Sequence, residues 1–342
     1  MKPIEHKTEA IRLTSTEIGH LWNTYMLEST VHQMFSYFLQ HVVDENIKDI
    51  LEINLNMTND SLVLLENTFK KAGLHTPRGT ISEDVFLTAP RLYSDIFYVL
   101  YLNSMSQFAL MTYSIAYSQS SRADIREFFK HYLNRLILVN QQVTELMLKK
   151  GIYVRPPFVT TVLEVDFVKK ESFLTGFVSD KRPLTVFEIT SLFSNAQLNA
   201  LGTVLLTGFI QISKSKKLQK YFMSGKELSN KYYHDFSNIL LEEDLTAPPS
   251  YAGEVMDSTE SPFSERLMLF HATWLTSFGL STYGTALASV QRRDLTALYV
   301  KVMAQVGIYA NNGVKLMIEN EWMEQPPLAP DREAIVKTKS PY

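Results

Sequence analysis

Apolar residues recur along the start of the chain at the three- and four-residue spacing of an amphipathic helix. Between residues 14 and 43 this stripe consists of Ile18, Leu21, Trp22, Tyr25, Phe35, Leu39 and Val42. Thr14 and Glu17 precede it at the spacing of a capping box, which covers the free amides of a helix N-terminus. Gly73 follows the next periodic segment, where a left-handed C-terminal cap is expected. The pattern predicts helices at about 14–43, 45–72, 90–119 and 124–151.

The same pattern occurs a second time further along the chain. At a constant offset of 171 residues, segment 13–77 aligns with segment 184–248, and the two share twelve identical positions. Thr185 and Glu188 repeat the capping box. At an offset of 170 residues, 91–157 aligns with 261–327, and both copies end on a double proline. Chance similarity of two helical segments is the alternative, but it does not explain why caps and breakers agree as well as apolar positions.

The repeat predicts an all-α protein, a tandem duplication of a ferritin-like four-helix bundle. The second copy places its helices at about 185–213, 216–243, 262–290 and 293–320. The connection between the second and third helices of each copy is long enough to run the length of a bundle, which favours one long crossover over a plain up-and-down arrangement. The expected units are a first bundle at 1–157, a linker at 158–183, a second bundle at 184–330 and a C-terminal tail at 331–342.

Three of the predicted helices contain long stretches without Asp, Glu, Lys or Arg, at 96–121, 189–213 and 267–291. Because these stretches include Asn103, Gln107 and His271, burial within the protein is favoured over a membrane span. Small residues in the second copy allow close approach of neighbouring helices. They are Ala196, Ala200, Gly202, Gly208, Gly279, Gly284, Ala286 and Ala288. We expect these helices to form the seam where the two bundles pack against each other.

Composition and charge exclude several classes of function. The 33 basic and 36 acidic residues give a net charge of -3, which argues against a nucleic-acid partner and against a polybasic membrane patch. The absence of cysteine excludes disulfides, thiolate catalysis and zinc or iron–sulfur sites built on thiolates. The first 20 residues contain no apolar segment typical of a secretory signal, so we expect a cytoplasmic protein.

Four residues are candidates for a metal site in the first bundle. Glu28 and His32 stand four residues apart on the first helix, as do Glu127 and His131 on the fourth, so each pair shares one helix face. Such carboxylate and imidazole groups suit iron, zinc or manganese. The alternative is that His32 is a hydrogen-bonded core residue and that Glu127 complements the helix dipole. The equivalent residues of the second copy are Asn199, Thr203, Ala297 and Lys301, which cannot reproduce the site.

Several segments resemble a known family. They are SFLTGFVSDKRPLTVFEITSLFSNAQLNALG (172–202), DSTESPFSERLM (257–268), YGTALASVQRRDL (283–295) and EWMEQPP (321–327). This chain is similar over its whole length to domain-of-unknown-function family 3231 of spore-forming bacteria. The resemblance implies tandem ferritin-like bundles with a relation to spore coat proteins, and it supplies no catalytic residues.

No motif fixes a reaction, so the leading hypothesis is a non-enzymatic binding or structural protein associated with sporulation or the spore coat. A metal-binding protein using the four residues of the first bundle is the runner-up, and a small-molecule or lipid carrier with an apolar cavity is the third. We predict no cofactor under the leading hypothesis. The expected partners are the two bundles for each other, a second copy of the chain, or coat proteins. Any site is expected in the first bundle or at the seam.

Overall fold

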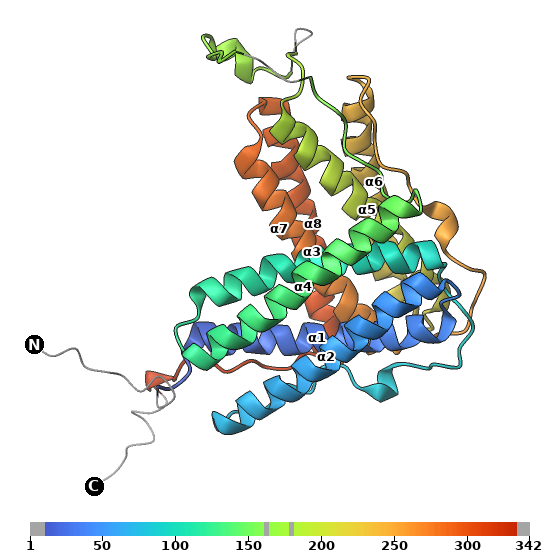
Figure 1. Cartoon of the computed structure of the whole chain (residues 1–342), viewed down its shortest axis with the longest axis vertical. Coiled ribbons are helices and arrows are strands. Elements are labelled where there is room, and N and C mark those ends of the chain that lie inside the picture. The colour runs from blue at the N-terminus through green and yellow to red at the C-terminus, as the bar shows by residue number, and fades with distance from the viewer. Residues whose placement is uncertain (1–10, 161–163, 178–180, 334–342) are drawn as a thin grey trace, which may run out of the picture.

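The computed structural model describes residues 11–160, 164–177 and 181–333, and in these ranges eight long helices form two bundles joined by a linker (Figure 1). The first bundle contains α1 (Ser15–His41), α2 (Glu45–Lys71), α3 (Asp95–Gln119) and α4 (Ala123–Lys149). The second contains α5 (Val186–Ile212), α6 (Lys216–Leu241), α7 (Glu265–Ser289) and α8 (Arg293–Glu319). The all-α tandem architecture predicted from the repeat is confirmed. The structure does not describe residues 1–10, 161–163, 178–180 and 334–342, which include parts of the expected linker and tail.

The helix ends follow the capping residues. Thr14 and Thr185 each accept a hydrogen bond from the backbone of a glutamate three residues later, and both capping boxes are complete. The third helix of each bundle begins later than predicted, because Ser94 and Ser264 are its N-caps. The residues before these serines form extended backbone that pairs with the other half of the chain, so they are not available to the helix.

Each bundle has one long connection that runs along its length. The backbone N–H of Val43, after the end of α1, lies 3.1 Å from a carboxylate oxygen of Asp95 at the start of α3. His20 near the start of α1 lies 2.9 Å from Gln119 at the end of α3. Helix α1 is therefore antiparallel to α3, and the chain returns along the whole bundle between α2 and α3. One long crossover of this kind occurs in ferritin-like bundles.

The two crossovers pair with each other. Isolated antiparallel bridges join Val85 to Phe263 and Tyr93 to Val255. The 170-residue offset converts one bridge into the other, since Val85 corresponds to Val255 and Tyr93 to Phe263. The two halves of the chain are therefore related by an approximate two-fold axis that passes between the crossovers.

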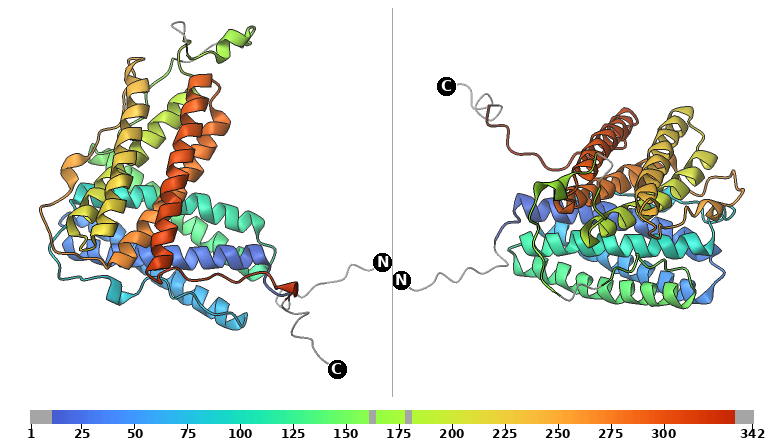
Figure 2. Two further views of the ribbon diagram at one scale, coloured as in Figure 1. Left: turned by 180° about the vertical axis from the view of Figure 1, so that it is seen from behind. Right: turned by 90° about the horizontal axis from the view of Figure 1, so that it is seen from above.

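The second bundle stands at a steep angle on the first, and α3, α5 and α7 contribute to the seam (Figures 1 and 2). Phe108 of α3 packs edge-on against Trp274 of α7, with ring centroids 4.2 Å apart. Tyr93 lies over Gly208 and donates a 2.8 Å hydrogen bond to a carbonyl of α5, which a larger residue at 208 would prevent. One apolar core continues across the seam from the first bundle into the second. The two halves thus pack intramolecularly, as the charge-free helices predict.

The described part of the linker consists of irregular backbone and one short 3-10 turn, η3 (Glu171–Leu174). Arg182 attaches its end to the second bundle through an ion pair with Glu188. None of the described helices is both long and apolar enough to span a membrane. The expected domain boundaries stay a prediction.

Candidate binding cavities

The four predicted metal ligands do not come together in one site. Glu28 is buried, and His32 is half-buried with its Nδ1 3.0 Å from the Thr58 hydroxyl. Glu127 is 70% exposed and pairs with Lys130, and His131 is also exposed. Among the residues that the structure describes, no three His, Asp or Glu side chains are placed to hold a metal. Binding of iron, zinc or manganese therefore stays a prediction without a ligand cluster to support it.

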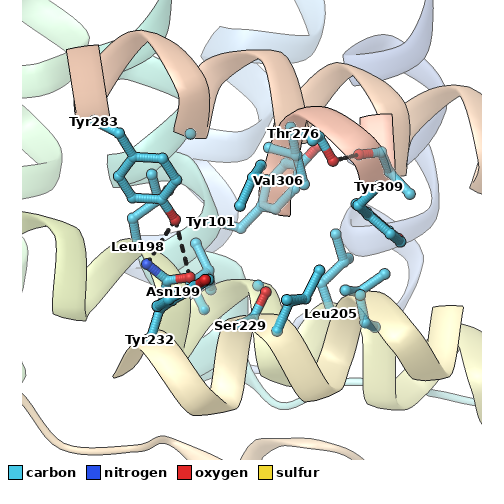
Figure 3. Close-up of a pocket in the computed structure, with 18 of the residues that line it drawn as sticks. Tyr101, Leu198, Asn199, Leu205, Ser229, Tyr232, Thr276, Tyr283, Val306 and Tyr309 are labelled. Atoms are coloured by element: carbon cyan, nitrogen blue, oxygen red, sulfur yellow. Dashed lines mark hydrogen bonds between the residues drawn. The ribbon is translucent and has the colours of Figure 1, made fainter. Parts of the chain in front are cut away.

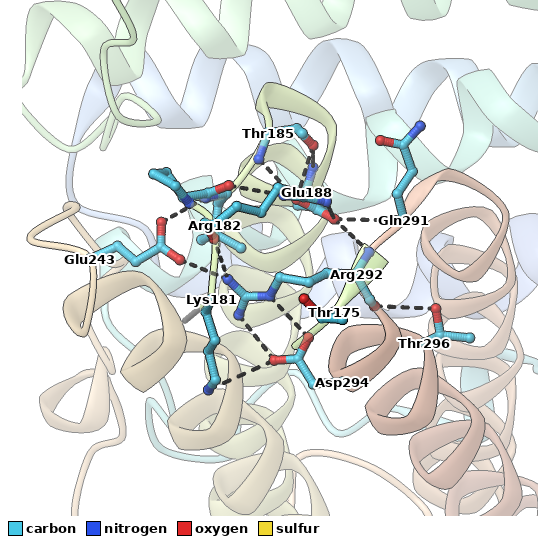
Figure 4. Close-up of polar contacts among 12 residues, drawn as sticks. Thr175, Lys181, Arg182, Thr185, Glu188, Glu243, Gln291, Arg292, Asp294 and Thr296 are labelled. Carbon is cyan, nitrogen blue, oxygen red and sulfur yellow. Dashed lines mark hydrogen bonds and ion pairs between the residues drawn. The ribbon is translucent and has the colours of Figure 1, made fainter. Parts of the chain in front are cut away.

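The capping glutamates of both copies are engaged in structural contacts at one end of each bundle, and Figure 4 shows those of Glu188 in the second copy. Glu188 accepts hydrogen bonds from the backbone of Thr185 at 2.8 Å and of Arg292 at 2.9 Å, so one carboxylate joins the starts of α5 and α8. Glu17 makes the same contacts in the first bundle. Burial raises the pKa of each carboxyl, but the hydrogen bonds outweigh it and lower the pKa to about 2.

Around Glu188 the second bundle adds a network of paired charges (Figure 4). Arg292 is 2% exposed and reaches both Glu243 at 2.8 Å and Asp294 at 2.9 Å. Arg182 lies 2.7 Å from Glu188 and holds the linker in place. Since each of these charges has an opposite partner, the network leaves no free group for a ligand and serves to anchor helix ends.

A cavity of about 80 Å³ lies inside the second bundle, against the seam. Side chains from all four helices of that bundle point into it, together with Tyr101 and Met105 from α3 of the first bundle (Figure 3). None of its lining residues is charged, and most are apolar. Its polar groups are the hydroxyls of Ser229, Thr276 and several tyrosines, and the amide of Asn199.

Small residues create the space. Gly202 lies on α5, Gly225 on α6, and Ala272 and Gly279 on α7, and all four line the cavity. A Cβ at Gly225 would collide with the hydroxyl of Tyr309, whereas a Cβ at Gly279 would meet its nearest atom, in Tyr283, at 3.5 Å. Glycine inside a helix costs about 1 kcal/mol relative to alanine. Three glycines at these positions therefore reduce helix stability, and at Gly279 the missing side chain leaves open space in the cavity.

A smaller cavity of about 30 Å³ occupies the equivalent place in the first bundle. Twelve of its thirteen lining residues align with lining residues of the larger cavity at the offsets of the repeat. The thirteenth is Trp274, which comes from the second bundle. The two cavities are thus one feature present in both copies, and not two unrelated packing defects.

Substitutions between the copies explain the difference in volume. The first copy has Val31, Leu102 and Ala109 where the second has Gly202, Ala272 and Gly279. The side chain of Asn54 likewise stands where the second copy has Gly225. Each exchange removes side-chain atoms from the second bundle, although the Tyr309 hydroxyl occupies the space next to Gly225.

The polar group at the floor of each cavity also differs between the copies. In the second bundle the Asn199 amide and the Tyr283 hydroxyl are joined by hydrogen bonds of 2.8 and 3.0 Å (Figure 3). The first bundle has Glu28 and Tyr113 at these positions, and Tyr113 donates to Glu28. Burial raises the pKa of Glu28 to about 7, although the hydrogen bond from Tyr113 acts to lower it. One cavity is neutral, and the other contains an ionisable carboxyl.

The larger cavity belongs mainly to the second bundle, with two side chains from the seam, and the expectation of a site in the first bundle or at the seam stays a prediction. Gly202 and Gly279 line the cavity, although their sequence pattern suggests close helix contact at the seam. Gly208 does serve that purpose, beneath Tyr93. A position-by-position comparison of the two copies indicates this cavity in the sequence, because small residues in the second copy correspond to larger ones in the first.

Comparisons with known proteins agree with the tandem arrangement. A family model described as "Protein of unknown function (DUF3231)" matches residues 4–165 and again residues 172–335, which confirms the resemblance found in the sequence. No curated protein matches the chain. A solved structure described as a "putative spore coat protein" from Bacillus halodurans C-125 is similar with a TM-score of 0.41 and 18% identity. That match covers 45% of this chain and 100% of the other, and a likeness of this degree says nothing about function.

Proposed function

This chain belongs to the DUF3231 family of proteins of unknown function, and we propose that it is a non-enzymatic binding protein whose second bundle holds a small, uncharged, mostly apolar ligand. The proposal is supported by one observation above all. The same cavity is present in both copies, and the second copy enlarges it with glycines that lower helix stability.

The lining of the larger cavity defines the chemistry of the ligand. With no charged residue in its lining, the cavity would leave the charge of an ionic ligand unpaired at a large energetic cost. The Ser229 hydroxyl makes no hydrogen bond to any other described residue, so it is free to contact one polar atom of a ligand. A dry apolar cavity of about 150 Å³ holds benzene or xenon. The cavity of about 80 Å³ suits a smaller molecule or the end of an alkyl chain.

Xenon provides a direct test, because it enters apolar cavities without needing hydrogen bonds. Saturable xenon binding measured by 129Xe NMR is expected for the natural chain, and xenon-pressurised crystals should place the atom among Leu205, Leu228 and Val306. Gly279→Ala is expected to weaken binding several-fold, because its methyl group enters the cavity.

Gly284→Ala is the matched control. Gly284 lies on the same helix but does not line the cavity, and the nearest atom to an added Cβ is the Met303 methyl at 3.9 Å. The Gly284→Ala variant should bind xenon as the natural chain does. Equal binding by both variants, or none by the natural chain, would disprove the proposed site. Mass spectrometry of solvent extracts from the purified natural chain and Gly279→Ala would then identify the natural ligand.

Association with spores stays a prediction that rests on the family resemblance. It is tested by immunodetection of the protein in fractionated sporulating cells. Recovery in the coat fraction would support a coat role, and recovery only in the mother-cell cytoplasm would contradict it.

A further inference from the structure

The cavity of the first bundle contains a buried carboxyl with only one hydrogen-bond partner. Glu28 is 7% exposed and lines this cavity together with Asn54, Thr58 and Ser106. Tyr113 donates to its Oε1, and no other described residue donates to the carboxyl. No Lys, Arg or His side chain lines the cavity. The second oxygen of Glu28 is therefore left without a partner beside a small space.

The side chains that line the cavity are uncharged at neutral pH apart from Glu28 itself, and burial lowers the pKa of the half-buried His32, one turn further along α1. Tyr113 faces Glu28 from α3, and Tyr132 interacts with it from α4. Asn54 and Thr58 of α2 also line the cavity, and neither titrates. Trp274 of α7 closes it from the second bundle. Among the described residues, no cationic side chain lines the cavity, and burial accordingly favours the protonated form of Glu28.

The fold does not require a carboxyl at this position. The second copy has Asn199 there and keeps the same tyrosine partner, so a neutral amide satisfies the local hydrogen bonding. The charge of Glu28 is thus an addition specific to the first copy. A buried group of this kind commonly has a functional purpose.

We propose that the cavity of the first bundle binds a small protonated amine, such as ammonium or methylammonium, against the Glu28 carboxylate. An ammonium group supplies both the missing positive charge and N–H donors for the unpartnered oxygen. The polar residues Asn54 and Thr58 also line the space. The volume of about 30 Å³ admits one or two water-sized groups and excludes larger amines.

The titration of Glu28 provides the measurement. Carboxyl 13C NMR of glutamate-labelled protein is recorded from pH 5 to 9 in ammonium chloride and, at equal ionic strength, in sodium chloride. The Glu28 resonance is assigned by its loss in Glu28→Gln. We expect a lower Glu28 pKa in ammonium chloride, by about one unit when ammonium is at ten times its Kd. Methylammonium should act similarly, and tetramethylammonium should have no effect because it lacks N–H donors and is too large.

An unchanged Glu28 pKa in all salts would overturn the proposal and indicate a water molecule in the cavity. Binding of methylammonium chloride is also measured calorimetrically. Glu28→Asn, which introduces the residue found in the second bundle, should abolish this binding. Gly279→Ala, which narrows the cavity of the second bundle, should leave methylammonium binding unchanged. The outcome is therefore independent of whether the second bundle binds an apolar ligand.

Discussion

Two glycine-to-alanine substitutions in the second bundle should have different effects on stability, because only one of them stabilises the protein. Both Gly279 and Gly225 are buried within helices and line the larger cavity. Alanine at either position gains about 1 kcal/mol from helix propensity. The two differ in what the new methyl group meets, so the pair isolates the packing contribution.

At Gly279 the methyl group enters open space, with its nearest atom, in Tyr283, at 3.5 Å. Burying one methyl group contributes about 0.8 kcal/mol. Gly279→Ala should therefore raise the free energy of unfolding by about 1–2 kcal/mol. Gly284 lies outside the cavity, so Gly284→Ala should raise the free energy of unfolding only by the helix-propensity contribution.

At Gly225 the methyl group would collide with the Tyr309 hydroxyl and lie 3.0 Å from a methyl of Leu206. Tyr309 is 7% exposed and its ring is stacked on Tyr221 at 4.3 Å, so it has little room to move. Overpacking of this kind costs about 1–3 kcal/mol, which cancels or exceeds the propensity gain. Gly225→Ala should be neutral or less stable by up to about 2 kcal/mol.

Urea unfolding followed by circular dichroism at 222 nm measures these differences directly, with the slope m as a check that the unfolded state is unchanged. From most to least stable, the expected order is Gly279→Ala, Gly284→Ala, the natural chain and Gly225→Ala. If Gly225→Ala stabilised the protein as much as Gly279→Ala, the described shape of the cavity would be wrong.

Three further predictions concern other parts of the molecule. The pKa of Glu188 is lowered to about 2 in the folded state, so this carboxylate contributes about 2–3 kcal/mol to the free energy of unfolding at pH values above its unfolded pKa of about 4.5. That contribution is lost as the pH falls towards 2, and Glu188→Gln should therefore make the free energy of unfolding depend less on pH in that range. Gly208→Ala should destabilise the seam by about 1–3 kcal/mol through its collision with Tyr93, seen as a lower Tm, and an unchanged Tm would refute this packing. Metal analysis of protein purified without chelators should show no stoichiometric iron, zinc or manganese and no change in His32→Ala; stoichiometric metal lost in that variant would establish the site.

The sequence determined the helices and their duplication, because the features that fix them are local. The capping boxes at Thr14 and Thr185 specify where a helix begins. Apolar spacing specifies which face is buried, and the constant offset relates the copies. Where a non-local partner competes, the local signal fails, and α3 and α7 begin at Asp95 and Glu265 because the residues before them pair across the two crossovers.

Only the tertiary structure decided which inward-facing residues leave empty space and which share a site. A glycine at helical spacing has the same local signature whether it lies beneath Tyr93, as Gly208 does, or lines a cavity, as Gly279 does. The four-residue spacing of Glu127 and His131 is likewise the same at an exposed surface as in a buried site. Volume, burial and ligand clustering depend on side chains from distant segments, so no local pattern specifies them.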